Sequence, residues 1–400
     1  MLVVLGLLPL ALASLLPIPQ ELVSREISTK LLATGQNVSG IPMVYPQQTT
    51  RDTGVWIPVG VDSWTSGFLP STFYALYERA ALCPSMTSES QRWLDLGRRW
   101  ATGELPLTIR NGQGHDVGFL SYPFVDELSV NAQNETAITV VNTFATMLAA
   151  RFNPIVGCTR SWDSSDPTDF QVIIDNMMNL EVLFVSADLT GNNTLREIAI
   201  SHANKTMVNH VREDGSSFHV VDYNSTTGLV IDRRTAQGYA DSSTWSRGQA
   251  WGVYGFANMF KRTSQQNYLE TARHMAAYFI DNIPANGIVP WDFNAPLDPP
   301  RPADTSAAMI ATNGLLLLAQ QEHSLRPANK SGATYYTNAA LKILTDTTVA
   351  FWKPTWQSLL ANGTVNNHGT AGNNLTGIVY GDYYFIKAGN TLIQSGITTC

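Results

Sequence analysis

The 400-residue sequence predicts an all-α fold, an (α/α)6 barrel built from six helical hairpins. Three observations lead to this prediction. Apolar residues recur at three- and four-residue spacing along most of the chain, which is typical of helices with one buried face. The predicted helices come in sequential pairs joined by short turns, with longer loops between pairs. A similar motif of polar, aromatic and glycine residues opens six helices, at intervals of roughly 50 to 75 residues, as a helical-hairpin repeat would.

The apolar spacing places ten helices along the chain, and a weaker one precedes them at residues 21–32. The ten ranges are 68–82, 93–105, 137–152, 173–187, 195–211, 250–261, 268–283, 307–320, 339–351 and 383–392. Strict alternation of apolar and polar residues, the pattern of a half-buried strand, is nearly absent, and residues 217–222 are the best strand candidate. We expect the helix at 21–32 to pack against the last helix and close the ring.

The six repeated motifs lie where helices begin. They are Trp64-Thr-Ser-Gly-Phe68, His115-Asp-Val-Gly-Phe119, Asp175-Asn-Met-Met-Asn179, Trp245-Ser-Arg-Gly-Gln249, Asp304-Thr-Ser-Ala-Ala308 and Gly381-Asp-Tyr-Tyr-Phe385. If the inner helices run parallel, all six motifs lie at one mouth of the barrel. The alternative is that they are ordinary helix N-caps, where Asp, Ser and Thr are preferred. Capping does not explain the Trp, His, Arg and Gln residues beside them, so we favour a ligand pocket.

Composition limits the class of protein. The chain is 44% hydrophobic and 14% charged, with a net charge of −7 and no run of Lys or Arg longer than two residues. These values exclude a nucleic-acid-binding protein and a polybasic membrane-surface protein, because both need concentrated positive charge. The aromatic and aliphatic content excludes a disordered chain. We expect a monomer.

The N-terminus predicts export. Residues 1–16 form a short apolar run with a small-x-small pattern at Ala11 and Ala13, which favours a secretory signal, so the single barrel domain would span residues 17–400. Eight Asn-x-Ser/Thr sequons favour a secreted, N-glycosylated protein. They begin at Asn37, Asn134, Asn192, Asn204, Asn224, Asn329, Asn362 and Asn374.

Several patterns of known chemistry are absent. The sequence has no His-Glu-x-x-His, Gly-x-Ser-x-Gly, P-loop or dinucleotide motif. Asp292 and Asp298 do not have the spacing of a calcium loop. Cys83 and Cys158 can pair in an oxidising compartment, and the terminal Cys400 is then expected to be free. We therefore expect no metal and no cofactor.

The predicted mouth suits an acidic sugar. Helix N-termini present unpaired N–H groups and a partial positive charge, so a ring of them favours an anionic ligand. Tryptophan rings add flat apolar faces that fit sugar rings, and the candidates are Trp64, Trp245, Trp251 and Trp291. The sequence thus indicates an extracellular barrel that binds a sugar acid.

Two carboxylates in the motifs are candidate catalytic residues. Asp175 has apolar neighbours on both sides, and burial there would raise its pKa, as a general acid working near neutral pH requires. Asp116 follows His115 and precedes an apolar segment, and two inward Asp side chains can act as a paired acid and base. The alternative for each is a capping or hydrogen-bonded structural Asp.

Other polar residues are candidates for substrate binding. The planar fork of Arg247 matches a substrate carboxylate, although a buried structural ion pair would also explain it. His219, Gln237 and Trp251 suit sugar contacts as well as they suit packing. The complete predicted set is Trp64, His115, His219, Gln237, Trp245, Arg247 and Trp251.

The motifs coincide with those of a known family. The run Thr235-Ala-Gln-Gly-Tyr-Ala-Asp-Ser-Ser-Thr-Trp-Ser-Arg-Gly-Gln-Ala-Trp-Gly-Val-Tyr-Gly-Phe256 strongly resembles the signature of unsaturated glucuronyl hydrolases, glycoside hydrolase family 88. Five of the motifs above, those at Trp64, His115, Asp175, Trp245 and Gly381, resemble the family in its order. Further matches are Asp214-Gly-Ser-Ser-Phe-His219 and Val289-Pro-Trp-Asp-Phe293.

The resemblance implies an (α/α)6-barrel enzyme that releases the 4-deoxy-4,5-unsaturated uronic acid left at the non-reducing end by polysaccharide lyases. It implies that Asp175 protonates C4 of the vinyl ether and activates the water that adds to C5, with Asp116 beside it. The resulting hemiketal collapses with loss of the aglycone. The resemblance also implies sugar contacts from His219 and Gln237 and a uronate contact from Arg247, with Trp64 and Trp251 as walls of the sugar site.

Two other functions stay open at this point. One is an unsaturated rhamnogalacturonyl hydrolase on the same barrel, and the other is a catalytically silent, secreted sugar-binding barrel. The Asn-rich segment 366–375 does not align with the family, so the choice among chondroitin-, hyaluronan-, heparin- and gellan-derived substrates also stays open. Arg233 and Arg234 could contact a sulfate or be ordinary solvated residues.

Overall fold

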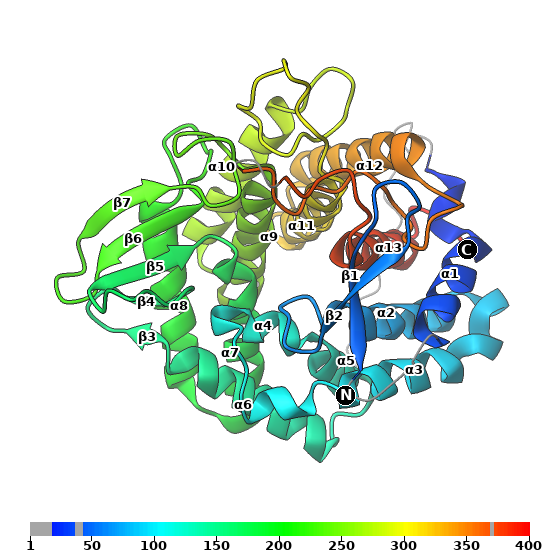
Figure 1. Ribbon diagram of the computed structural model, residues 1–400, viewed down its shortest axis with the longest axis horizontal. Coiled ribbons are helices and arrows are strands. Elements are labelled where there is room, and N and C mark those ends of the chain that lie inside the picture. The colour runs from blue at the N-terminus through cyan, green and yellow to red at the C-terminus, as the bar shows by residue number, and fades with distance from the viewer. Residues whose placement is uncertain (1–17, 37–42, 369–371) are drawn as a thin grey trace.

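The computed structural model describes residues 18–36, 43–368 and 372–400. It is mostly helical, and its helices form two concentric rings (Figure 1). The inner ring contains α2 (Phe68–Leu82), α4 (Val117–Leu120) continued by α5 (Tyr122–Val130), α7 (Asn176–Thr190), α9 (Ser246–Thr263), α11 (Thr305–Ser324) and α13 (Val379–Gln394). The outer ring contains α1 (Arg25–Gln36), α3 (Ser90–Thr102), α6 (Glu135–Ala149), α8 (Asn193–Asn209), α10 (Gln266–Asp281) and α12 (Lys330–Phe351). The predicted (α/α)6 barrel is confirmed.

The two rings differ in how their helices are buried. Inner helices touch the outer ring on one side and the barrel axis on the other, so α11 is buried on nearly all of its faces. Outer helices face solvent, and α3 buries only one stripe, which includes Trp93, Leu96 and Trp100. One continuous hydrophobic core joins both rings.

Arg79 of α2 closes the ring. Its side chain is 2% exposed and donates to the carbonyl oxygens of Leu22 and Ile386 and to Oδ1 of Asn390, at 2.8 to 2.9 Å. Leu22 lies in the short 3-10 helix η1 (Gln20–Val23), and the other two partners lie on α13. One buried guanidinium therefore ties the first inner helix to the last one and to the N-terminal segment that packs on it.

The cysteine pairing differs from the expected one. Cys83, which follows α2, is bonded to Cys400, and Cys158 is buried and unpaired. The prediction that Cys83 could pair with Cys158 and leave Cys400 free was therefore wrong. The physical reason is ring closure, because it brings the end of the chain beside the end of α2. Spacing along the sequence carries no information about that contact.

The structure also contains short strands in three small sheets, and Figure 1 shows the three-stranded sheet at one edge of the barrel. The antiparallel pairs are β1 (Val44–Thr49) with β2 (Trp56–Gly60), β3 (Phe152–Asn153) with β4 (Cys158–Thr159), and β6 (Val220–Asn224) with both β5 (Asp169–Ile173) and β7 (Val230–Arg234). The predicted strand at 217–222 overlaps β6. The other strands were not predicted because they are short and lack strict alternation of apolar and polar residues.

Most helix boundaries agree with the apolar spacing. The predicted range 68–82 is that of α2, and the other predicted helices overlap observed ones. The motif at His115 predicted the helix start at α4, but the apolar spacing gave no helix range for α4 and α5, because Gly118 and Ser121 interrupt that spacing and Pro123 reads as a break. Pro123 lies in the first turn of α5, where a missing N–H costs little.

The predicted signal at 1–16 and the sequon at Asn37 lie outside the described residues, so both stay predictions. Within the described part of the chain, no helix is long and apolar enough to cross a membrane.

Replacing Cys400 by Ser should lower the free energy of unfolding by about 2 to 5 kcal/mol, because the bond closes a loop with a sequence separation of 317 residues. Chemical denaturation with and without a reductant measures the effect. A reductant should lower the midpoint of the wild type and leave that of Cys400→Ser unchanged. Equal midpoints for wild type and variant under non-reducing conditions would contradict the prediction.

Candidate active site

The N-terminal ends of the inner helices meet at one mouth of the barrel. Trp64, just before α2, lies 5.5 Å from Phe119 of α4 and 4.9 Å from Tyr380 of α13, measured between ring centroids. Arg247, at the start of α9, forms an ion pair with Asp304, the residue before α11. Helix starts far apart in the sequence therefore lie together, as the repeated motifs predicted.

Asp175 lies between a strand and an inner helix. β5 ends at Ile173 and α7 begins at Asn176, so the carboxyl occupies the capping position of α7, yet it makes no capping hydrogen bond. The residue is 9% exposed, and its Oδ2 has no hydrogen-bond partner among the described residues. Burial raises the pKa of Asp175 to about 6, against the opposing effects of the Arg247 charge and the Trp251 indole. This carboxyl is available for chemistry.

Asp116 is the second free carboxyl at the mouth. It occupies the capping position of α4 and also makes no capping bond. Burial raises the pKa of Asp116 well above its usual value, and the charge of Asp175 raises it further, while a hydrogen bond with Asn179 and the charge of Arg151 lower it. Because the charge of one carboxyl raises the pKa of the other, the two resist joint ionisation.

His219 directs an N–H group at Asp175. Its Nδ1 accepts a hydrogen bond from the backbone N–H of Ala236 at 3.1 Å. A neutral ring whose Nδ1 accepts carries its hydrogen on Nε2, which lies 3.8 Å from Oδ2 of Asp175. Burial lowers the pKa of His219 well below its usual value, and the charge of Arg247 adds to this, so the ring is neutral. Trp245 packs against it with 4.3 Å between ring centroids.

His115 supports Asp116 from a fully buried position. Its side chain is 0% exposed, and its Nε2 lies 3.5 Å from Oδ1 of Asp116. The side-chain amide of Asn179 lies 2.9 Å from its Nδ1. Burial, followed by the charge of Arg151, lowers the pKa of His115 to about 3. We predicted a substrate contact for this ring, but the structure gives it the Asp116 carboxyl as its neighbour.

Arg247 is held by protein groups on both arms of its fork. Nη1 donates to Oδ2 of Asp304 at 2.9 Å and to the carbonyl oxygen of Thr364, and Nη2 donates to the carbonyl oxygen of Val365 at 2.6 Å. Asp304 in turn caps α11 by accepting from the N–H groups of Ser306 and Ala307. Arg247 therefore forms a buried structural ion pair, and Asp304 is an ordinary helix N-cap. These were the alternatives to ligand binding that the sequence left open. The charge of Arg247 still acts on Asp175.

Comparison with known proteins identifies the family. The unsaturated glucuronyl hydrolase of Formosa agariphila is 34% identical to this chain over 364 residues, which cover 86% of this chain and 83% of that protein. The chain belongs to the unsaturated glucuronyl hydrolase family. It is therefore a glycoside hydrolase, as the motifs predicted. No family model matches the chain.

Solved structures agree with this assignment. The unsaturated glucuronyl hydrolase from Bacillus sp. GL1, described as responsible for the degradation of glycosaminoglycan, superposes with a TM-score of 0.79 at 28% identity, covering 91% of this chain and 95% of that one. An unsaturated glucuronyl hydrolase described as specific for heparin gives a TM-score of 0.80 at 29% identity, covering 93% and 95% of the two chains.

The remaining predicted residues of this hydrolase differ in exposure. Trp64 is partly exposed, whereas Trp245 and Trp251 are buried at 2% and 0%. Gln237 donates through Nε2 to the carbonyl oxygen of Val365 at 3.0 Å, and Trp291 donates through Nε1 to the carbonyl oxygen of Gln237 at 2.7 Å. Trp64 and Gln237 can therefore still meet a ligand, and the buried tryptophans shape the wall behind them.

Sequence reasoning missed some residues of the site. Asn179 lies inside a recognised motif, one helical turn after Asp175, but only the structure shows its contacts with Asp116 and His115. The backbone of Thr364 and Val365 holds Arg247, and no side-chain pattern signals that role. The described residues contain no group of three or more His, Cys, Asp or Glu side chains placed to hold a metal ion.

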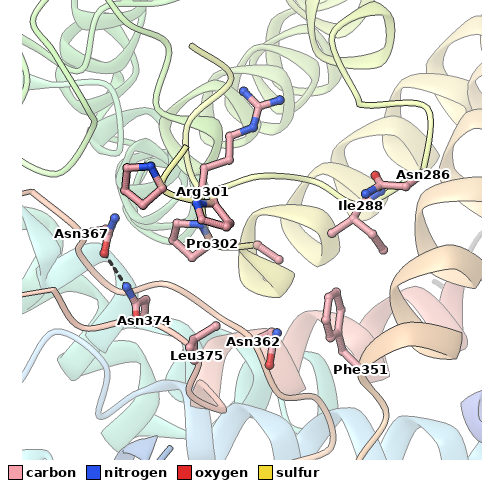
Figure 2. Close-up of a pocket in the computed structure, with 12 residues that line it drawn as sticks. Asn286, Ile288, Arg301, Pro302, Phe351, Asn362, Asn367, Asn374 and Leu375 are labelled. Atoms are coloured by element: carbon pink, nitrogen blue, oxygen red, sulfur yellow. Dashed lines mark hydrogen bonds between the residues drawn. The ribbon is translucent and has the colours of Figure 1, made fainter. Parts of the chain in front are cut away.

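A cavity of about 620 Å³ lies near the start of α11 (Figure 2). Its lining includes Asn286, Ile288, Pro302, Phe351, Asn362, Asn367, Asn374 and Leu375. Figure 2 shows the guanidinium of Arg301 pointing away from the other lining side chains, and it donates to the carbonyl oxygen of Phe293. Asn362 and Asn367 therefore border this cavity, and Thr364 and Val365 between them hold Arg247 through their backbone carbonyl oxygens.

Arg247→Met should lower the free energy of unfolding by about 3 to 5 kcal/mol, because it leaves the carboxylate of Asp304 buried without its partner. Chemical denaturation measures the change. Lys342→Ala, which breaks an exposed pair with Asp346, is the matched control and should cost less than about 1 kcal/mol. Equal, small losses in both variants would show that the buried pair does not hold the mouth together.

Proposed function

We propose that this hydrolase releases 4-deoxy-4,5-unsaturated glucuronic acid from the non-reducing end of lyase-generated oligosaccharides by hydrating the C4=C5 bond. The observation that supports the proposal is the pair of carboxyls at the mouth, the buried Asp175 and the partly exposed Asp116, neither of which caps its helix. A carboxyl that keeps its proton near neutral pH can protonate carbon, and a second one can remain ionised beside the developing positive charge. The resemblance of the motifs to the family gives the same assignment.

In the proposed reaction, Asp175 transfers its proton to C4, and the ring oxygen shares the positive charge that forms at C5. Water then adds to C5 and gives up a proton to the Asp175 carboxylate, which restores the acid. The resulting hemiketal opens, and the C1–O bond to the aglycone breaks in the collapse. Asp116 stabilises the positive charge, and the Nε2–H of His219 keeps Asp175 oriented.

The substrate carboxylate needs positive potential at the mouth. Both arms of Arg247 are already occupied, so we assign its charge to the field around Asp175 and not to a bidentate clamp. The N-terminal ends of the inner helices add partial positive charge in the same place. Trp64, with its partly exposed ring, supplies the flat face for the sugar.

The proposed substrate class is tested by following the ultraviolet absorbance of the 4,5-double bond. The absorbance should fall on incubation with at least one unsaturated disaccharide from a panel derived from chondroitin, hyaluronan, heparin, gellan and pectin. Loss of absorbance with the pectin-derived compound alone would instead assign a rhamnogalacturonyl hydrolase, and binding without any loss would assign a sugar-binding barrel.

Asp175→Asn should lower kcat by at least about 100-fold and leave substrate affinity within about tenfold, because only the proton donor is lost. Steady-state kinetics and equilibrium binding of the same disaccharide measure the two quantities. Lys342→Ala serves as the control, since Lys342 is exposed and pairs only with its helix neighbour Asp346. Substantial activity in Asp175→Asn would place the acid elsewhere.

The rate should fall as pH rises through about 6, because the raised pKa of Asp175 makes it lose its proton there and only the protonated form can donate to C4. Because the charges of Asp175 and Asp116 affect each other, the falling limb of the pH–rate profile reports the pair of carboxyls and not Asp175 alone. A profile of kcat/KM against pH measures it. A rate that stays constant or rises between about pH 6 and 8 would rule out a carboxyl acid as donor.

A further inference from the structure

Asn179 is a buried side chain that the proposed chemical steps do not use. It lies on α7, one helical turn after Asp175, and is 0% exposed. Its Nδ2 lies 2.9 Å from Nδ1 of His115, and its amide also hydrogen-bonds the Asp116 carboxyl. An amide nitrogen has two hydrogens, so one Asn179 side chain can donate to both partners at once.

The backbone is shaped to allow this contact. Gly118, in the first turn of α4, packs directly on Asn179, and a Cβ atom at Gly118 would lie 2.5 Å from both Cα and Cβ of Asn179. No side chain fits in that space. The glycine of the His115-Asp-Val-Gly-Phe119 motif therefore lets α4 and α7 approach closely enough for the Asn179 amide to reach across.

The hydrogen bond to His115 also sets the state of that ring. A ring whose Nδ1 accepts from the amide carries its hydrogen on Nε2, and Nε2 lies 3.5 Å from Oδ1 of Asp116. Asp116 is thus faced by two N–H donors, one from Asn179 and one from His115. Donors of this kind favour the ionised form of a carboxyl.

We propose that Asn179 is a positioning residue that holds His115 and Asp116 in place and favours the ionised form of Asp116 against the effect of burial, which leaves the proton of the pair to Asp175. The inference rests on the proposed function, because it matters only if Asp175 is the donor. It adds a residue that touches neither substrate nor reacting atoms and acts through His115 and Asp116.

The charged and titratable groups around the pair allow the effect on pH dependence to be derived. Asp116 is faced by Asp175, by Arg151 after α6 and by His115, and Asp175 is faced by Arg247 of α9 and by His219. Asn179→Ala adds or removes no charged group among them. Loss of the amide therefore raises the pKa of Asp116 and draws the shared proton away from Asp175.

The test compares Asn179→Ala and Asn179→Asp with Asn313→Ala. Asn313 is a buried asparagine of the inner helix α11, and its Nδ2 donates only to the carbonyl oxygens of Met309 and Tyr384. Asn179→Ala should lower kcat by about 10- to 100-fold with KM within about threefold, and should move the falling limb of the pH profile upward. Asn179→Asp keeps the size of the side chain, adds a negative charge beside Asp116, and should move the limb in the same direction.

Asn313→Ala should lose stability to a similar degree while its kcat and pH profile stay those of the wild type. The proposal is overturned if folded Asn179→Ala and Asn179→Asp keep the wild-type kcat and limb, or if Asn313→Ala shifts them equally. Nitrogen-15 NMR of protein with isotope-labelled histidine gives a readout that does not depend on turnover. The His115 signals should show hydrogen on Nε2 in the wild type and change in Asn179→Ala. Unchanged signals would overturn this proposal whether or not the proposed function holds.

Discussion

Closure of the helical ring is the constraint on which the site depends. The functional side chains come from the starts of different inner helices, so they meet only when the first and last of those helices are side by side. Arg79 makes that junction by joining α2 to α13 and to the segment around Leu22, and the Cys83–Cys400 bond fastens the end of the chain to the same place. Closure also surrounds the mouth with inner helices, and burial there raises the pKa values of Asp175 and Asp116.

Two carboxyls in one aromatic pocket then create the chemistry. Burial raises the pKa of Asp175, and burial together with the charge of Asp175 raises that of Asp116, so the two resist joint ionisation. His219 and the Trp251 indole act on Asp175, and His115 and Asn179 act on Asp116. The ion pair of Arg247 with Asp304 fixes the loop at Thr364 and supplies positive charge without being free itself.

Much of the fold and part of the site could be predicted from residue patterns. Apolar spacing located the inner and outer helices, and the repeated motifs located the ends that form the mouth. Asp175 and Asp116 were predicted as a pair because they open helices between apolar neighbours. The apolar spacing gave no range for α5, because Pro123 reads as a break, although the motif at His115 predicted a helix start just before it. The Cys83–Cys400 bond was missed because a contact between the first inner helix and the chain end leaves no local signal. The contacts of Arg247, His115 and Asn179 were hidden for a similar reason, since each partner lies on another element.

The sequence by itself determined the class of the protein. Periodicity fixes which face of each helix is apolar, and a signature of more than twenty residues fixes the family, because both are properties of neighbours along the chain. Only the tertiary structure decided which polar groups are free to act. Asp304 and Asp175 each occupy a helix-capping position, yet the first caps its helix and binds Arg247, whereas the second makes no cap. That difference depends on what the neighbouring helices bring within hydrogen-bonding distance.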